Sequence, residues 1–271
     1  MSHEIMIPDS ADLPAHIVNR DTATKANASI IAGISEGMHA RIKMSGKQFV
    51  LVNSNGEETA IPNGKLFKAD DDNLYLRTVF LGAKTALQKR WYATKYDPSK
   101  EGAAPDCFSN DGEKPDPSIP SPQCETCALC PHNQFGSGVN SDGQATGGKS
   151  CTDNKILAVF VPPLKQGDAA PGVFELKVTP ASLKNLRLYV NALDSKGIMI
   201  GNVFTLVTFD DKASFPILTF QYGGAIPQAA VEQFAEMSQS PETNAIVNQQ
   251  ITWSNKEAAV GADKPAPKKP A

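Results

Sequence analysis

The sequence lacks two of the motifs that mark common enzyme families, and it has few histidines. There is no GxGxxG of dinucleotide-binding proteins and no HExxH of metalloproteases. The histidines are scattered and have no obvious acidic or nucleophilic partner: His3, His16, His39 and His132. A zinc deaminase is excluded because Pro122 and Cys124 are not adjacent and no His-x-Glu precedes them. We therefore expect a protein that is not an enzyme.

Long apolar runs are also missing. No stretch approaches the length that spans a bilayer, and the first residues have neither the basic nor the apolar part of a secretion signal. The cysteine count of five is odd, which together with the missing signal disfavours disulfides. We expect a soluble protein of a reducing, cytosolic compartment, with no membrane partner.

Net charge is small, but charge is unevenly distributed. The chain of 271 residues has a formal net charge of −3, which does not by itself indicate a nucleic-acid-binding protein. Residues 41–95 hold ten Lys or Arg against five Asp or Glu, whereas residues 105–155 hold three Lys against seven acidic residues. A locally basic face is compatible with a polyanionic partner and equally with ordinary solvated strands.

Hydrophobic patterning predicts a β-rich α+β protein. Roughly ten short apolar or alternating runs read as strands, and residues 179–193 and 226–239 read as amphipathic helices. We expect an N-terminal arm over residues 1–35, a single body over residues 36–250 and a disordered Ala/Pro/Lys tail over residues 251–271. A cysteine-containing insertion, residues 105–152, interrupts the body.

This insertion contains all five cysteines and is rich in Pro, Gly, Ser, Asn and Asp. Such a segment buries too little apolar surface to offset its ordering entropy, so a bound metal is the expected source of its order. Cys-x2-Cys spacing, which suits a tetrahedral ion, occurs twice in overlap. We predict a structural zinc site formed by Cys107, Cys127, Cys130 and Cys151, with Cys124 outside it. The same spacing resembles an iron–sulfur ligand run, and free or disulfide-bonded thiols are the third interpretation.

Residues 87–96 interleave cations with aromatic side chains. This is the combination by which single-stranded nucleic acid is held, since aromatic rings stack on bases and cations contact phosphates. The alternative is a strand whose aromatics point into a core and whose cations point to water. The candidate phosphate contacts are Arg41, Lys43, Lys47, Lys89, Arg90 and Lys95, and the candidate base contacts are Phe49, Trp91 and Tyr92.

Several short motifs resemble a bacteriophage family. They are Tyr92 with Tyr96-Asp-Pro, Pro105–Gly112, Cys127–Ser137 and Gly148–Cys151. The resemblance covers residues 40–240, and its four cysteines match the set predicted above, whereas Cys124 departs from the pattern. This family is similar to phage single-stranded DNA-binding proteins, which combine an OB-fold with, in some cases, a zinc knuckle. The resemblance implies an OB-like antiparallel barrel and a location in the host cytoplasm.

Three functions are compatible with these observations. The first is single-stranded DNA binding in phage replication or recombination, alongside the proteins of those processes. The second is a structural or host-interaction module that docks through its zinc loop, which the acidic cysteine stretch favours. The third, a metal-dependent nuclease or redox protein, depends only on the acidic turn at residues 70–72 and on the iron–sulfur-like spacing.

Overall fold

The computed structural model describes residues 39–63, 66–68, 74–93, 105–139, 143–163 and 171–251. The predicted N-terminal arm, the tail from residue 252 onward and Lys95 lie outside these ranges. Within the described part of the chain, no helix is both long and apolar enough to cross a membrane.

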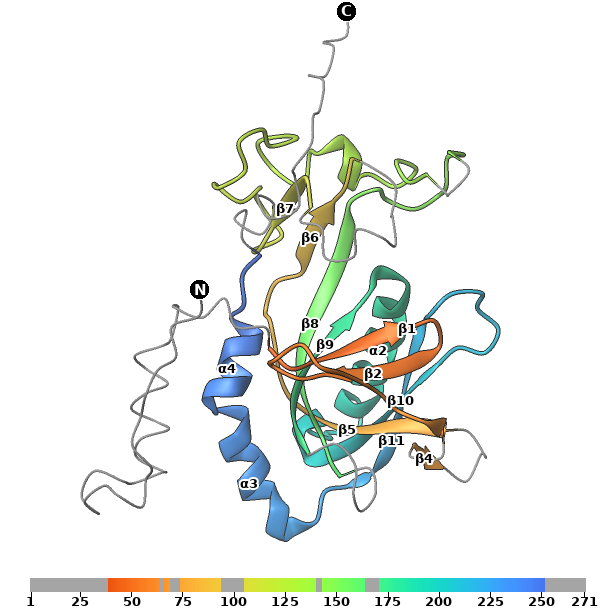
Figure 1. Cartoon of the computed structure of the whole chain (residues 1–271), viewed down its shortest axis with the longest axis vertical. Helices are drawn as coiled ribbons and strands as arrows, with labels where there is room; N and C mark the ends of the chain where they lie inside the picture. The colour runs from red at the N-terminus through yellow and green to blue at the C-terminus, as the bar shows by residue number, and fades with distance from the viewer. Residues whose placement is uncertain are drawn as a thin grey trace, which may run out of the picture. The chain divides into compact units, whose positions relative to one another are not determined.

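A curled sheet forms the centre of the molecule (Figure 1). Its main path runs β11-β10-β5-β8-β9-β1-β2-β3. The strands are β1 (Arg41–Ser45), β2 (Gln48–Val52), β3 (Glu58–Ala60), β4 (Phe67–Lys68), β5 (Leu74–Ala83), β6 (Gln88–Trp91), β7 (Cys107–Ser109), β8 (Thr152–Val161), β9 (Gly172–Val178), β10 (Val203–Phe209) and β11 (Leu218–Ala225). All neighbours on this path are antiparallel except β1 and β9, which pair in parallel through Arg41 with Glu175 and Ile42 with Leu176.

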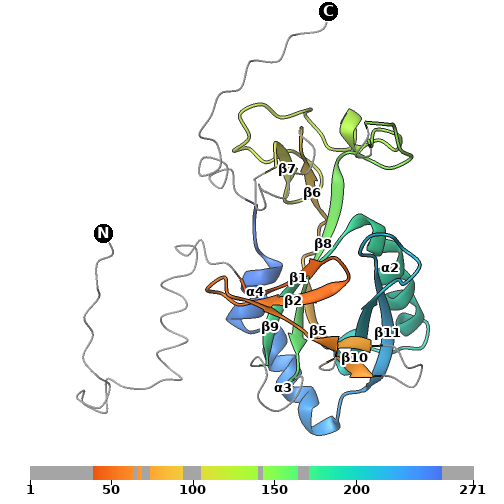
Figure 2. The same ribbon diagram turned by 45° about the vertical axis from the view of Figure 1, so that its right-hand side comes forward.

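Three α-helices cover the sheet on its two faces (Figures 1 and 2). They are α2 (Pro180–Asp194), α3 (Gln228–Ser238) and α4 (Pro241–Val247), and short 3-10 helices lie at η4 (Pro131–Asn133) and η5 (Ile200–Asn202). The prediction of a strand-rich α+β protein with few helices is confirmed, and its sheet is a curled half-barrel. The finer prediction of an OB-like barrel is considered under Proposed function.

The central strand β8 is apolar without alternation because both of its faces are buried. Leu157, Val159 and Val161 enter a core shared with α2, and Ile156 and Ala158 enter a second core on the opposite face. A strand buried on both faces reads as a continuous apolar run. The middle of the sheet is therefore rigid, and the start of β8 extends from it to the cysteines.

Helix α2 closes the larger core. It begins after Thr179 with Pro180 in its first turn, where a missing N–H has no cost. On its inner face Tyr189 is buried, whereas the neighbouring Val190 is 38% exposed. The Tyr189 hydroxyl is hydrogen-bonded to Thr205 Oγ1 at 2.9 Å, which satisfies its polar end inside the core.

Helices α3 and α4 pack over the second core, which contains Val79, Leu81 and Ile246. Ser240 caps α4, since its hydroxyl accepts a hydrogen bond from the Thr243 N–H at 3.2 Å. The chain after α4 then reaches the cysteines.

A second, small sheet contains Cys107, lies next to the loops with the other cysteines, and projects away from the main sheet (Figures 1 and 2). Strand β6 pairs with β7 on one side and with the first residues of β8 on the other. We call residues 105–139 and 143–151 the cysteine region. Asn110 fastens the C-terminal segment to it, because its amide donates to Ile251 O at 3.0 Å and accepts from Ile251 N at 2.8 Å.

Candidate metal centre

The five cysteines converge on one small cavity. The cavity has a volume of about 20 Å³, and its walls include every cysteine of the chain: Cys107, Cys124, Cys127, Cys130 and Cys151. This is about the space that one water-sized particle occupies. Because the donors are five sulfur atoms, a soft or borderline metal ion is the chemical species that suits the space.

Three separate parts of the chain bring the cysteines together. Cys107 lies in β7 opposite Trp91 of β6. The Cys127 N–H donates to Glu113 O at 2.8 Å, and the Cys151 N–H donates to His132 O at 2.8 Å, just before β8 begins. Backbone hydrogen bonds therefore fix the positions of Cys127 and Cys151 independently of any metal.

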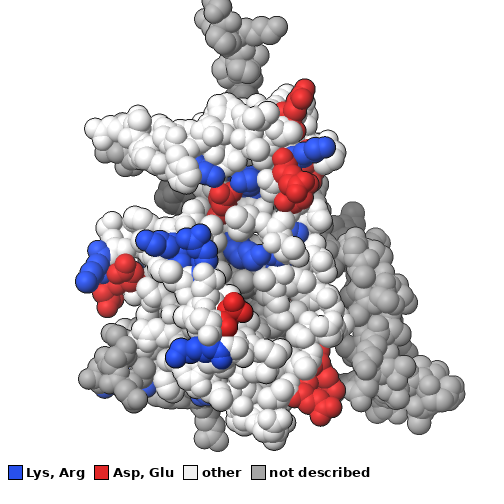
Figure 3. Space-filling model, turned by 180° about the vertical axis from the view of Figure 1, so that it is seen from behind, with Lys and Arg blue, Asp and Glu red and all other residues white. Residues whose placement is uncertain are grey.

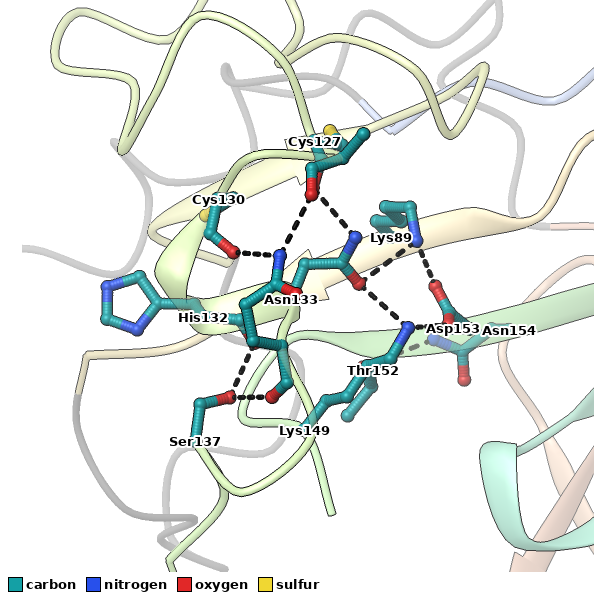
Figure 4. A network of polar contacts seen from close by, with 12 residues as sticks. Lys89, Cys127, Cys130, His132, Asn133, Ser137, Lys149, Thr152, Asp153 and Asn154 are labelled. Carbon is teal, nitrogen blue, oxygen red and sulfur yellow. Dashed lines mark hydrogen bonds and ion pairs between the residues drawn. The ribbon is translucent and has the colours of Figure 1, made fainter. Parts of the chain in front are cut away.

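A tight turn carries Cys127 and Cys130 (Figure 4). The Cys130 N–H donates to Cys127 O at 3.4 Å, and the Asn133 N–H donates to Cys130 O at 3.0 Å. The side chain of Asn133 also donates to Cys127 O at 2.7 Å, and Gln134 Nε2 donates to Cys130 O at 3.1 Å. Pro131 begins the short helix η4, and the fixed φ of this proline favours the turn. Side-chain amides thus replace the regular secondary structure that the turn lacks.

Two lysines lie beside Asn133, which holds the turn that carries Cys127 and Cys130 (Figure 4). Asn133 Oδ1 accepts from Lys89 Nζ at 3.3 Å and from Lys149 Nζ at 3.1 Å. Both lysines also pair with Asp153, and Lys89 is itself part of the cavity wall. A four-thiolate zinc site carries two excess negative charges, so adjacent cations stabilise the metal-bound form.

Burial raises the pKa of the thiols. For Cys151 burial is the main cause and brings the pKa to about 12, against an opposing effect of Lys89. The pKa of Cys124 is also raised to about 12, by burial and then by its hydrogen bond to Cys130. Burial likewise raises the pKa of Cys107 and Cys127. Without a metal these four thiols are therefore protonated at neutral pH, and metal binding would have to release protons.

The thiols do not form a closed coordination sphere. Among the described residues, no group of three or more Cys, His, Asp or Glu side chains is placed as a ready metal site. All five cysteines are free thiols. The convergence on one cavity and the adjacent cations fit a metal, and the sulfur atoms would have to draw together to bind it. The choice of Cys107, Cys127, Cys130 and Cys151 stays a prediction, because Cys124 lines the same cavity.

The predicted base contacts include one error. Phe49 is 2% exposed and stacks on Phe209 at 4.4 Å between ring centroids, so it belongs to the core and cannot stack on a base. Trp91 lines the cysteine cavity and stacks on His132 at 4.2 Å. Of the three predicted aromatics, Tyr92 is the most accessible, with 42% exposure.

The predicted cations that the structure describes lie in β1, in the β1–β2 turn and in β6. Lys89 belongs to the network around the cysteines. Lys43 pairs with Glu58, and Lys47 donates to a backbone carbonyl at Asp211. Their places are as follows: Arg41 and Lys43 in β1, Lys47 in the β1–β2 turn, Arg90 in β6 with its Nη2 3.2 Å from Gln88 Oε1, and Lys95 outside the described residues. Figure 3 shows one face of the molecule, on which basic and acidic side chains are intermixed.

Exposed apolar side chains in the cysteine region were missed by the sequence reasoning. Leu129 and Phe135 are each 81% exposed, and Val139 is 60% exposed. Lys149 Nζ lies 5.0 Å from the centre of the Phe135 ring. A large apolar residue in a segment without apolar periodicity is the sequence signal for such exposure, because the residue has no core to enter.

Two short sequence patterns typical of enzymes occur in this chain. Gly143–Ser150 matches the phosphate-binding GxxxxGK[ST], but strand β8 follows it where that motif requires a helix. Gly33–Gly37 matches GxSxG and lies outside the described residues.

In comparisons with protein-family models, curated proteins and solved structures, no match to this chain was found. Function is therefore argued from the cysteine region and its surroundings.

Proposed function

We propose that this protein binds single-stranded DNA through its cysteine region, which a structural zinc ion stabilises. Cys107, Cys127, Cys130 and Cys151 hold the metal. The observation that carries the proposal is the Phe135 side chain, which is 81% exposed on this region with Lys149 beside its ring. The proposed role is in phage DNA replication or recombination, in keeping with the resemblance described above.

An exposed aromatic ring beside a cation is suited to an unpaired nucleotide. The ring stacks on the base, the cation contacts the phosphate, and zinc knuckles present such groups to single strands. Tyr92 offers a second ring, since it is 42% exposed at the end of β6, the strand that also carries Lys89 and Trp91 of the cavity wall. A duplex would not fit this mode because its bases are stacked on one another.

Cations outside the cysteine region supply further phosphate contacts in this proposal. Lys43 is engaged in a surface ion pair with Glu58, and such pairs contribute about 0–1 kcal/mol, so phosphate can displace the carboxylate. Arg41, Lys47 and Arg90 remain candidates of the same kind. Phe49 is excluded from the interface.

The proposal does not depend on an OB-like barrel. OB-folds are five-stranded, whereas the main path of this sheet has eight strands. The resemblance to phage single-stranded DNA-binding proteins supports a relationship of this fold to the OB-fold. The structure agrees with that relationship only in having a sheet curled into a half-barrel.

The decisive experiment is fluorescence anisotropy of a labelled oligo-dT, at low and high salt, with a duplex of equal length as the control. We expect salt-sensitive binding of the single strand and weak binding of the duplex. Phe135→Ala should lower the affinity about tenfold, because stacking on one base contributes about 1–3 kcal/mol. Phe215→Ala is the matched control, since Phe215 is 56% exposed and lies outside the cysteine region. Equal losses in both variants, or no binding at low salt, would refute the proposal.

A second function is favoured by the remaining exposed side chains of the cysteine region. Leu129 and Val139 are apolar and exposed, and the surrounding sequence is acidic, which disfavours DNA. These features suit a docking surface for a protein partner with basic and apolar side chains. Absence of oligo-dT binding in the anisotropy experiment, with the zinc content intact, would leave this as the better interpretation.

A further inference from the structure

Five cysteines surround a cavity in which a structural zinc ion needs only four, so one thiol is left over. Cys124 is the extra thiol in the assignment above. It is not remote from the others, because it lines the same cavity of about 20 Å³. A free thiol that shares so small a cavity with a metal ligand is arranged for disulfide chemistry with that ligand.

The groups that act on each thiol favour Cys130 as the partner. The pKa of Cys124 is raised by burial and then by Cys130, ahead of Cys127 and Cys107. The Cys127 thiol interacts with Ser109, and the Cys107 thiol with the backbone of Gln123. Among the cysteines that line the cavity, Cys130 is therefore the one that interacts most strongly with Cys124.

We propose that Cys124 is a resolving thiol that converts oxidation of the zinc ligand Cys130 into a reversible disulfide. A peroxide oxidises the zinc-bound Cys130 thiolate to a sulfenic acid and is itself reduced to hydroxide. The Cys124 thiol then attacks the Cys130 sulfur, the S–S bond forms, and the sulfenic oxygen leaves as water with the thiol proton. Zinc has lost one ligand and is released, and a dithiol reductant regenerates both thiols.

The proposed step suits the environment of both sulfur atoms. Cys130 is 7% exposed, so a small oxidant such as hydrogen peroxide reaches it more readily than a bulky disulfide would. Cys124 is only partly buried and belongs to the irregular segment after Pro122, where few backbone hydrogen bonds oppose its movement. Sulfenic acids without a nearby thiol proceed to sulfinic acid, which thiols do not reduce. The Cys124–Cys130 disulfide therefore protects the metal centre from permanent loss. This inference rests on the proposed zinc site and not on DNA binding.

The test uses the full-length zinc-loaded protein and hydrogen peroxide. Zinc release is followed with a colorimetric chelator, the cysteine products are mapped by mass spectrometry, and zinc rebinding is measured after treatment with dithiothreitol. In the wild type we expect a Cys124–Cys130 disulfide and recovery of zinc binding. In Cys124→Ser we expect zinc in the purified protein, sulfinic acid at Cys130 after peroxide and at least about twofold lower recovery.

Ser121→Ala is the matched control, because Ser121 is exposed in the same segment and its side chain has no hydrogen bond among those of the described residues. It should behave as the wild type. Purification of the wild type without zinc, loss of zinc from purified Cys124→Ser, a different dominant disulfide in the wild type, or full recovery by Cys124→Ser would each overturn the proposal. Because none of these readouts involves DNA, they are independent of the anisotropy result.

Discussion

At the scale of single residues, Asn133 has the most consequential position in the cysteine region. Its amide group joins the Cys127 carbonyl to Lys89 and Lys149, and these lysines in turn join it to Asp153. Metal sites depend on such surrounding hydrogen bonds to orient their ligands. An asparagine provides donor and acceptor at once, which neither aspartate nor alanine does.

Asn133→Ala should therefore destabilise the protein by about 1–3 kcal/mol, since it removes one hydrogen bond each from the Cys127 carbonyl, Lys89 and Lys149. Urea unfolding monitored by tryptophan fluorescence would measure this change, because Trp91 lines the cysteine cavity. Asn55→Ala is the control, as Asn55 is exposed in the β2–β3 turn. An equal effect in the two variants would show that the network has no structural role.

Residue type predicted that the cysteines lie together, whereas it did not separate buried from exposed aromatic side chains. The cysteines stand out because their chemistry is specific and their surroundings contain no core-forming pattern. Phe49 shows the contrary case: alternation along a strand does not reveal which face is buried until the sheet is assembled. Phe135 was missed because a lone aromatic in a loop carries no periodic signal.

At the scale of elements, the turn after β7 is held by one carboxylate. Asp111 Oδ1 accepts hydrogen bonds from Ser109 Oγ at 2.8 Å, from Glu113 N at 2.8 Å and from Lys114 N at 3.1 Å. Burial alone would raise the pKa of Asp111, but these hydrogen bonds outweigh it and lower the pKa below 3.8. The Cys127 N–H donates to Glu113 O in the same turn, so this carboxylate supports a predicted zinc ligand.

A group whose folded pKa is lowered stabilises the protein above its unfolded pKa, and this contribution is lost as pH falls through the folded pKa. The turn should therefore weaken as pH falls below about 4, the ordinary pKa of aspartate, and open when Asp111 is protonated at still lower pH. Hydrogen exchange at Glu113 and Lys114 measures this opening. Asp111→Asn should reduce the pH dependence, whereas Glu125→Gln, at an exposed carboxylate, should not; identical profiles would contradict the assignment.

Elements were predicted best where their own sequence determines them. The helix expected at residues 179–193 and the one expected at 226–239 correspond to α2 and α3, because capping and apolar spacing are local signals. The pairing of β1 with β9 joins Arg41 to Glu175 and has no local signal at all. The order of strands, and hence the distinction between a half-barrel and an OB barrel, depends on such distant pairings.

At the scale of the whole molecule, the main sheet and the cysteine region are stabilised by different interactions. The main sheet is stabilised by two apolar cores, whereas the cysteine region contributes few buried apolar side chains beyond Phe108 and Ile119. Removal of zinc should therefore loosen the cysteine region and leave the sheet folded, because metal-binding energy is folding energy for that region alone.

Stability measured against pH with and without zinc provides the corresponding test. Zinc-bound cysteines carry no protons, so the loaded protein should become more stable as pH rises toward 9. Without metal, the pKa of Cys124 and of Cys151 is raised to about 12, so their contribution is present below about pH 9 and lost as pH rises further. Thermal melting between about pH 6 and 10, with bound zinc measured by mass spectrometry, would show the two trends. The same pH dependence in both forms would exclude a thiolate metal site.

The parallel pairing of β1 with β9 has a consequence for synthesis. Strand β1 ends at Ser45 and its partner β9 ends at Val178, so about 130 residues must be translated before this side of the sheet can close. At about 5–20 residues per second this takes on the order of ten seconds. During that interval the β1–β2 hairpin presents an open edge and the apolar side chains of Ile42, Phe49 and Leu51 to the cell. This stretch of the nascent chain therefore keeps an unpaired strand edge until β9 has been made.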